Sequence, residues 1–216
     1  MSIDSDGLLE MKLEGFPRED RQALKKRWRR KTSGLRRSLT QEDHRRWSQL
    51  TCSRLDGLLA TLGARSIGVY APVKGEVDLA GLWEGEKPRA RSFYFPRISE
   101  NHMTFHVAVN PGEDLRPGAL GIPAPPSCAP FESPSALEVV LVPGLAFDVF
   151  GGRVGFGAGF YDRMFGPLKA RPWLVGVGFM FQLEWDAPLP VESYDVLMDW
   201  VVTNRECVRC LPCSYT

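Results

Sequence analysis

Short apolar runs of strand length recur along the chain after residue 63, and they constrain the fold more than any other feature. Several of them are apolar at successive positions, which is typical of strands buried on both faces of a sheet. Helix-length segments at residues 78–86 and 159–169 separate some of these runs. This alternation predicts an α/β fold, a mainly parallel sheet flanked by helices. The expected strands are residues 66–70, 92–95, 103–107, 137–142, 173–179 and 199–202.

A helical pair is expected ahead of the sheet. Residues 1–17 have no stable hydrophobic period and are interpreted as a loose extension, whereas residues 18–37 indicate a basic helix interrupted near residues 32–34. A second helix should begin after Thr40, whose side chain can cap the N–H of Asp43, and should end at Gly63. One domain over residues 18–204 is therefore expected.

Two segments give weaker indications. The proline-rich stretch at residues 118–134 is expected to be a loop, because proline donates no ladder hydrogen bond. The five cysteines of this chain are expected to be reduced thiols. Three of them, Cys207, Cys210 and Cys213, lie in a tail at residues 205–216 that could bind a metal or could fray.

The most informative segment is the glycine-rich run from Arg153 to Arg163. Glycines at 155, 157 and 159 alternate with other residues, so several backbone N–H groups could approach an anion at the start of a helix. The spacing fits neither G-x-G-x-x-G nor a P-loop. The glycines could equally serve a tight turn between a strand and a helix.

Charged residues beside these glycines favour the anion site. Arg153 suits phosphate, but Asp162 in the first helical turn would repel it unless a cation bridges the two. Mg²⁺ prefers carboxylate and phosphate oxygens, so it is the expected bridge. Asp195 is the candidate for a second carboxylate, with a solvated cap as the alternative.

The N-terminal basic run offers further anion ligands. Nine of the seventeen residues from Arg21 to Arg37 are basic, which fits either a solvated helix face or a nucleic-acid patch. Lys25 and Arg29 are four residues apart and could grip one triphosphate from the same helical face. The net charge of +1 gives no overall preference for nucleic acid or acidic membranes.

A loop at residues 70–78 places Glu76 after an expected buried strand. A carboxylate there could accept paired N–H donors from a heterocycle such as a pterin, or could cap the next helix. The chain has no apolar stretch of the roughly 18 residues that a membrane span needs. A cytoplasmic protein that binds no membrane and no nucleic acid is expected.

Taken in order, these motifs resemble the 5-formyltetrahydrofolate cyclo-ligase family over residues 21–203. The resemblance rests on the following motifs: Lys25 with Arg29, the Gly-Glu-Val-Asp loop at 75–78, Phe-Pro-Arg at 95–97, the Asn-His-Met-x-Phe motif at 101–105, Gly-Ile-Pro at 121–123, the run at 141–163, and Asp195 with Asp199.

The resemblance implies a Rossmann-like sheet and a reaction that uses ATP and Mg²⁺. In that reaction 5-formyltetrahydrofolate closes to 5,10-methenyltetrahydrofolate after its formyl oxygen is phosphorylated. By position, it implies that ATP is held by Lys25, Arg29, Arg153, Gly155, Phe156, Gly157, Ala158, Gly159, Phe160 and Tyr161. It further implies catalytic roles for Lys25, Arg153 and Tyr161, and Mg²⁺ ligation by Asp162 and Asp195. The folate is expected to meet Ala71, Glu76 and the segment at 156–160.

The chain departs from the family's common pattern at two positions. Phe160 stands where the family commonly has Tyr, and Ala124 stands where it commonly has Glu. A non-catalytic or substrate-altered paralogue on the same fold is therefore the alternative function. The partners expected are ATP and a small folate, bound by a monomer.

Overall fold

A computed structural model describes residues 18–84, 91–100 and 102–211. The expected extension at residues 1–17 lies outside this part of the chain, as do Glu86, Asn101 and Cys213.

Two long helices open the described chain, α2 (Arg18–Ser38) and α3 (Gln41–Thr61). The side chain of Thr40 accepts a hydrogen bond from the backbone N–H of Asp43, which confirms the predicted cap of α3. Helix α2 runs unbroken through residues 32–34, so the predicted interruption is wrong. Thr32 and Arg36 are both buried, and these anchors hold the segment in helical form despite Gly34.

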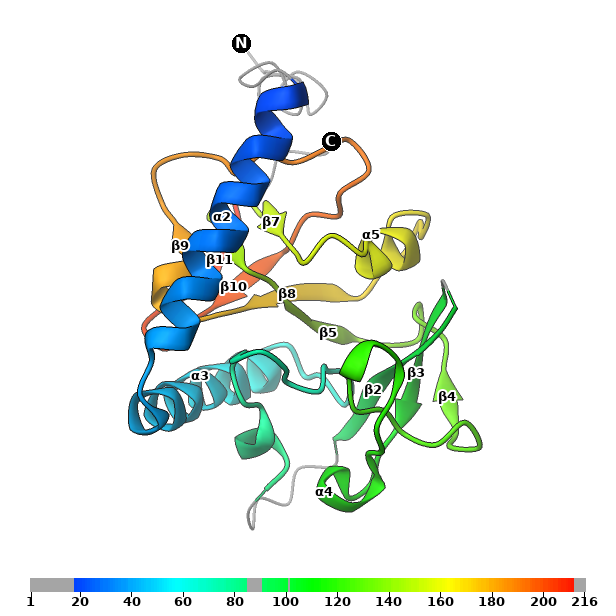
Figure 1. The fold of residues 1–216 in the computed structure, drawn as a ribbon. Coiled ribbons are helices and arrows are strands. Elements are labelled where there is room, and N and C mark those ends of the chain that lie inside the picture. Colours follow the sequence, from blue (N-terminus) through cyan, green and yellow to red (C-terminus); the bar gives the residue numbers. More distant parts are fainter. Residues whose placement is uncertain (1–17, 85–90, 101, 212–216) are drawn as a thin grey trace.

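An eight-stranded sheet crosses the middle of the molecule in the order β11-β10-β8-β5-β1-β2-β3-β4 (Figure 1). Strands β10, β8, β5, β1 and β2 run parallel to one another, whereas β3, β4 and β11 add antiparallel edges. The predicted α/β fold with a mainly parallel sheet is therefore confirmed. The strands are β1 (Ser66–Gly68), β2 (Ser92–Ser99), β3 (His102–Val107), β4 (Phe131–Glu132), β5 (Val139–Pro143), β8 (Trp173–Val177), β10 (Trp200–Val202) and β11 (Cys207–Arg209).

The two faces of the sheet bury separate cores. Val139 and Leu141 of β5 pack on the face that Leu55 of α3 covers. Val140 and Val142, which point the opposite way, pack with Phe165 on the other face. Figure 1 shows α3 and α5 (Phe160–Phe165) on opposite sides of the sheet, as the continuously apolar strands predict.

A smaller sheet lies against α2 and carries the site described below. Its order is β7-β6-β9, and both β6 and β7 contact α2. Its strands are β6 (Ala146–Asp148), β7 (Arg153–Val154) and β9 (Leu183–Glu184). The remaining elements are the short helix α4 (Pro111–Asp114) and the 3₁₀ turns η1 (Ala80–Leu82), η2 (Ala119–Gly121) and η3 (Met180–Gln182).

The helix predicted at residues 78–86 is wrong for residues 78–84, the part that the structure describes, because only the single turn η1 forms there. The first residue of this segment, Asp78, is hydrogen-bonded to α3. Its N–H donates to Ser48 Oγ, and its carbonyl accepts from Cys52 Sγ. These tertiary contacts replace helical pairing at the segment's start.

The helix predicted at 159–169 is real but shorter, because α5 ends at Phe165. Pro167 follows two residues later, and a proline has no N–H with which to continue the helical hydrogen bonds. Gly159 precedes the helix with a left-handed φ of 65°.

Two segments expected to be irregular contain short strands. The proline-rich loop at 118–134 includes η2 and the edge strand β4. The expected fraying of the tail is wrong for residues 207–209, which form β11 by antiparallel pairing with β10. No helix in the described ranges combines the length and apolar character needed to cross a membrane.

Candidate nucleotide and folate site

A cavity of about 450 Å³ lies beyond the carboxyl ends of β1 and β5, where α/β sheets commonly bind ligands. Segments from α2, the 70–76 loop, the 153–163 run and the loop before β10 form its wall. Every site residue expected from the sequence lines it: Lys25, Arg29, Ala71, Glu76, Arg153, Gly155, Phe156, Gly157, Ala158, Gly159, Phe160, Tyr161, Asp162 and Asp195. The fold thus gathers residues that are up to 170 positions apart.

The alternating glycines give three arginines room to lie over the loop. A Cβ at Gly155 would stand 2.8 Å from Arg153 Nη1, and one at Gly159 would stand 3.0 Å from Arg163 Nη1. At Gly157, where φ is +104°, a Cβ would lie 3.4 Å from Arg29 Nη2. The glycines therefore serve both a turn and the close approach of cations.

The loop's backbone adds donors to this cationic surface. Within the described residues, the N–H groups of Phe156, Gly157 and Ala158 donate no hydrogen bond. Helix α5 behind them has only six residues, so its dipole is small. The positive charge over this loop comes from the arginines, and the short helix adds little to it.

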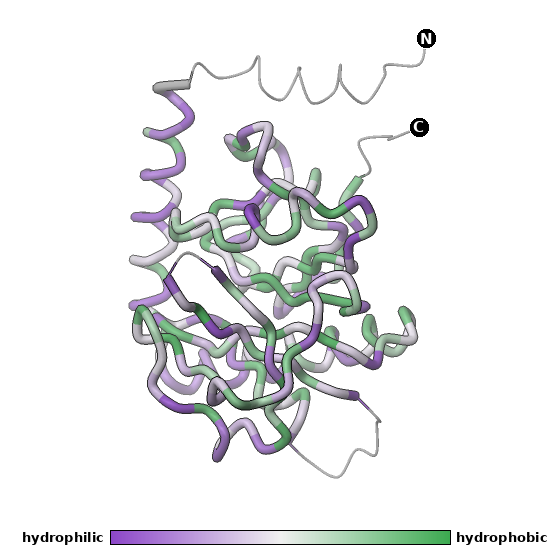
Figure 2. Tube along the Cα trace, turned by 90° about the vertical axis from the view of Figure 1, so that its right-hand side faces the viewer, coloured by the Kyte–Doolittle hydropathy of each residue, from purple (hydrophilic) through white to green (hydrophobic). Residues whose placement is uncertain are grey.

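Helix α2 presents cations to the cavity and not to solvent alone. Lys25 Nζ lies 2.8 Å from Asp195 Oδ2 and 3.9 Å from Glu192 Oε1. Arg29 Nε donates to the carbonyl of Gly155 at 2.9 Å, which fixes the guanidinium over the glycine loop. Figure 2 shows how hydrophilic α2 is along its length. Part of the basic run is therefore engaged inside the molecule.

Arg153 and Asp162 form a bidentate pair at the base of the loop. Arg153 Nη2 lies 3.1 Å from both carboxylate oxygens of Asp162, and its guanidinium carbon lies 5.5 Å from the Tyr161 ring centroid. Asp162 Oδ1 also accepts the N–H of Val196, which ties the loop to the segment before β10.

Asp162 and Asp195 are the two aspartates that line this cavity. Each is paired with a cation, Asp162 with Arg153 and Asp195 with Lys25. No group of three or more His, Cys, Asp or Glu side chains within the described ranges is arranged to hold a metal. Two carboxylates suit Mg²⁺, which usually takes one or two protein carboxylates together with phosphate oxygens and water.

Glu76 lines the same cavity, in a tight turn whose Lys74 Nζ lies 4.9 Å from the ring centroid of Phe156. Lys74 and Gly75 both adopt left-handed φ angles, and the N–H of Val73 donates to Glu76 Oε2 at 3.0 Å. Glu76 thus caps its own turn and not the next helix. Burial raises the pKa of Glu76, opposed by the Val73 hydrogen bond and by the charges of Arg36 and Lys74.

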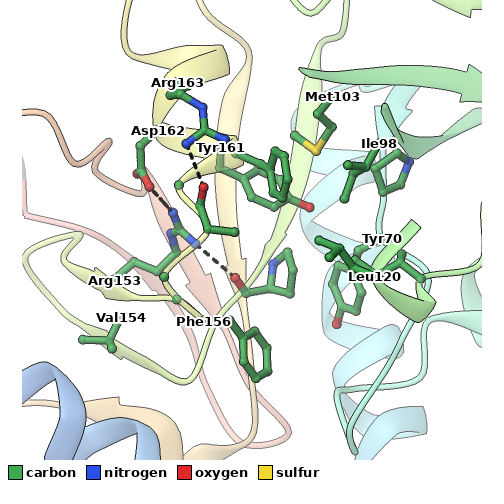
Figure 3. Close-up of a pocket in the computed structure, with 18 of the residues that line it drawn as sticks. Tyr70, Ile98, Met103, Leu120, Arg153, Val154, Phe156, Tyr161, Asp162 and Arg163 are labelled. Carbon is green, nitrogen blue, oxygen red and sulfur yellow. Dashed lines mark hydrogen bonds and ion pairs between the residues drawn. The ribbon is translucent and has the colours of Figure 1, made fainter. Parts of the chain in front are cut away.

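An apolar wall faces the cationic loop across the cavity. Figure 3 shows Ile98, Met103 and Leu120 opposite Arg153 and Asp162. Between the two sides stands Tyr161, whose ring stacks on Phe165. Burial raises the pKa of the Tyr161 hydroxyl, so it remains a neutral donor at physiological pH.

Several lining residues had no role assigned from the sequence. Met103 and Ile122 belong to motifs that carry the family resemblance, and this membership was the available signal. Tyr70, Lys74 and Leu120 also line the cavity, but they belong to none of those motifs. Leu120 reaches the cavity because its backbone takes a left-handed φ of 57° inside η2, which no residue pattern indicates.

The two departures from the family pattern lie in different places. Phe160 lines the cavity, with the Arg163 guanidinium carbon 5.1 Å from its ring centroid. Ala124 is buried away from the cavity and pairs with Arg116 through both backbone groups. Only Phe160 can therefore contact a ligand directly.

Comparison with known proteins identifies the family. A sequence model of the 5-formyltetrahydrofolate cyclo-ligase family matches residues 21–204. The 5-formyltetrahydrofolate cyclo-ligase of Saccharomyces cerevisiae is 31% identical, over 67% of this chain and 78% of the yeast protein. That of Escherichia coli K12 is 30% identical, over 78% of this chain and 93% of the bacterial protein.

Solved structures agree with these matches. The 5,10-methenyltetrahydrofolate synthetase of Aquifex aeolicus superposes with a TM-score of 0.73 at 32% identity, covering 87% of this chain and 93% of its own. A synthetase from Mycoplasma pneumoniae, at 19% identity and a TM-score of 0.66, supports the fold alone. The chain belongs to the 5-formyltetrahydrofolate cyclo-ligase family.

Proposed function

We propose that this chain converts 5-formyltetrahydrofolate into 5,10-methenyltetrahydrofolate, using ATP and Mg²⁺. The observation that carries the proposal is the single cavity, which joins a cationic glycine loop to a buried carboxylate and an apolar wall. The phosphates of ATP need the cationic loop. The pterin and its attached ring need the carboxylate and the apolar wall.

In this proposal the ATP phosphates lie over the glycine loop. Lys25, Arg29 and Arg153 neutralise their charge, and the free N–H groups of Phe156, Gly157 and Ala158 donate to phosphate oxygens. Asp162 and Asp195 hold Mg²⁺, which when bound would neutralise further phosphate charge. Arg153 and Lys25 must then leave their carboxylates for phosphate.

The folate lies beside the phosphates in the same cavity. Glu76 accepts N–H donors from the pterin, and Ala71 and the segment at 156–160 contact its rings. Ile98, Met103 and Leu120 offer apolar surface to the rest of the molecule.

Catalysis in this arrangement is positioning and charge neutralisation. The formyl oxygen takes the γ-phosphoryl group from ATP, which leaves as ADP. N10 then attacks the formyl carbon and loses its proton, and the formyl oxygen leaves as phosphate. Lys25 and Arg153 stabilise the charge on the transferred group, and the neutral Tyr161 hydroxyl donates a hydrogen bond near it. Phosphoryl transfer of this kind makes little demand for a protein nucleophile.

The test is direct. Purified protein is mixed with 5-formyltetrahydrofolate, Mg²⁺ and ATP, and the absorbance of the methenyl product is followed. Product formation that requires both ATP and Mg²⁺ is expected. Folate binding without product at any ATP concentration would overturn the proposal and favour the non-catalytic paralogue.

A further inference from the structure

Arg36 is a buried arginine beneath the cavity, and none of the roles described above uses it. It lies in the last turn of α2 with 5% of its surface exposed. Its Nη2 donates to the carbonyl of Gly144 at 2.6 Å, directly after the central strand β5. Gln182 Nε2 donates to the same carbonyl at 2.9 Å. Arg36 therefore links α2 to the carboxyl end of the sheet, where ligands bind.

The other side of this guanidinium faces Glu76. Arg36 Nη1 lies 4.0 Å from Glu76 Oε1, and both side chains are almost fully buried. The Cβ atom of Arg36 also underlies the turn, because a Cβ at Gly75 would meet it at 3.5 Å. Arg36 thus supports both the backbone of the turn and its carboxylate.

The pair is incompletely hydrogen-bonded. Within the described residues, Arg36 Nε and Nη1 are buried without a hydrogen-bond partner. Glu76 Oε2 is taken by the N–H of Val73, whereas Oε1 has only the long contact with Arg36. A buried charge pair of this kind is costly to retain. Its retention beneath the cavity therefore calls for a role beyond stability.

We propose that Arg36 is a positioning residue that keeps Glu76 ionised and aims its free oxygen at the pterin. The inference rests on the proposed function, because it takes the folate to be the partner of Glu76. Arg36 itself does not line the cavity, so it acts only through Glu76.

The charged and titratable groups around Glu76 support this choice. Arg36 reaches it from α2 and Lys74 from its own turn, while the ring of His44 on α3 bonds its backbone carbonyl at 2.8 Å. Tyr70 and Tyr161 add no charge of either sign, because burial raises the pKa of both hydroxyls and both stay protonated and neutral. Lys74 is exposed, so water screens its charge. Arg36 is the buried cation among these groups.

The test replaces Arg36 with Met, which keeps length without charge, and measures the Kd for 5-formyltetrahydrofolate from about pH 6 to about pH 9. Losing the guanidinium raises the pKa of Glu76, so more of it is protonated and cannot accept two donors. We expect binding roughly tenfold weaker near pH 7, recovering as the pH rises. Arg36→Lys should restore most of the affinity. Arg37→Met is the matched control, because Arg37 is the exposed neighbour.

A double variant separates positioning from mere support. In Glu76→Gln there is no carboxylate to hold, so adding Arg36→Met should cause little further loss and no pH dependence. An equal, pH-independent loss in both backgrounds would overturn the inference. If Arg36→Met does not fold, as judged by its thermal midpoint, Arg36→Gln is measured by the same criteria. Failure of the wild-type protein to bind 5-formyltetrahydrofolate rejects the proposed function, whereas unchanged binding by Arg36→Met rejects only this inference.

Discussion

The two carboxylates of the proposed metal site each hold a cation that a nucleotide would need. Lys25 Nζ is 2.8 Å from Asp195, and Arg153 pairs with Asp162. Phosphate must therefore compete with carboxylate for both cations unless Mg²⁺ takes the carboxylates. Nucleotide and metal should bind together more readily than either binds alone.

Asp195→Asn tests this competition. The change removes the charge that holds Lys25, so ATP should bind severalfold more tightly in the presence of EDTA, while the advantage that Mg²⁺ confers shrinks. Titration calorimetry with and without Mg²⁺ measures both affinities. Asp20→Asn is the control, because Asp20 is exposed on α2, the helix that carries Lys25. Weaker metal-free binding by Asp195→Asn would contradict the competition.

Gly157→Ala should impair nucleotide binding through the backbone. Gly157 has a φ of +104°, and a Cβ there would crowd Arg29 Nη2 at 3.4 Å. We expect a loss of about 1–3 kcal/mol of stability or a displaced loop, and a higher KM for ATP. Gly112→Ala, where a Cβ meets no atom within 4 Å and φ is ordinary, should leave KM unchanged.

At the scale of single residues, the sequence predicted the groupings of site residues that lie close together in the chain. Lys25 with Arg29 and Arg153 with Asp162 are close in sequence, so helical period and flanking charge suffice to assign each couple to one site. The direct ion pair between Arg153 and Asp162 was not predicted. Arg36 could not be chosen from its basic neighbours, because its burial depends on Gly144, 108 residues away. Positions 25, 29, 32 and 36 lie on one face of a helix, and this spacing could have indicated that Arg36 is buried.

Among the elements, α2 carries Lys25, Arg29 and Arg36, so it must stay rigid over its whole length. The structure makes it continuous through Gly34, where a Cβ would meet no atom within 4 Å. Gly34→Ala should therefore stabilise the protein by about 0.5–1 kcal/mol, since alanine favours helix. Calorimetry should show a higher thermal midpoint with kcat/KM unchanged. Lost activity would instead identify a hinge at residues 32–34.

The junction of β1 and β5 depends on the charge of Glu138. Its carboxylate accepts the N–H groups of Arg65 and Ser66 at 2.5 and 2.8 Å. These bonds lower the pKa of Glu138. Their contribution to stability is complete above the ordinary glutamate pKa of about 4.3 and is lost as the pH falls through the folded value.

Glu138→Gln should therefore lower the thermal midpoint at pH 7, and the difference from wild type should shrink as the solution is acidified. Glu113→Gln, at an exposed position, should show no such difference. A difference that stays constant down to acidic pH would mean that packing, and not charge, accounts for the effect.

Helices and strands were predictable where the residues that determine them are neighbours in the sequence. The cap at Thr40 and the buried strands follow from side-chain chemistry and apolar runs. The missing helix after Asp78 was not predictable in the same way, because Ser48 and Cys52 on α3 bind the backbone of that residue. Strand β11 needs β10 as a partner, so its residues alone could not indicate it.

At the scale of the whole molecule, the cavity joins segments that otherwise meet little. A ligand that binds only the folded state stabilises it, by about 2.7 kcal/mol at a hundredfold excess over Kd. For a domain of this size that corresponds to a rise of roughly 5–10 °C in thermal midpoint. Mg²⁺ with ATP should produce such a shift in the wild-type protein and a smaller one in Lys25→Met. Equal shifts in both proteins would remove Lys25 from the proposed nucleotide site.

The contact between Lys25 and Asp195 spans 170 residues, and it has a consequence for synthesis. On the ribosome, the cationic face of α2 emerges long before the carboxylates that neutralise it. Chains that terminate early therefore carry a basic helix without its counter-charges and have no complete site for nucleotide. The nucleotide site proposed above is therefore complete only after residue 195 has been added to the chain.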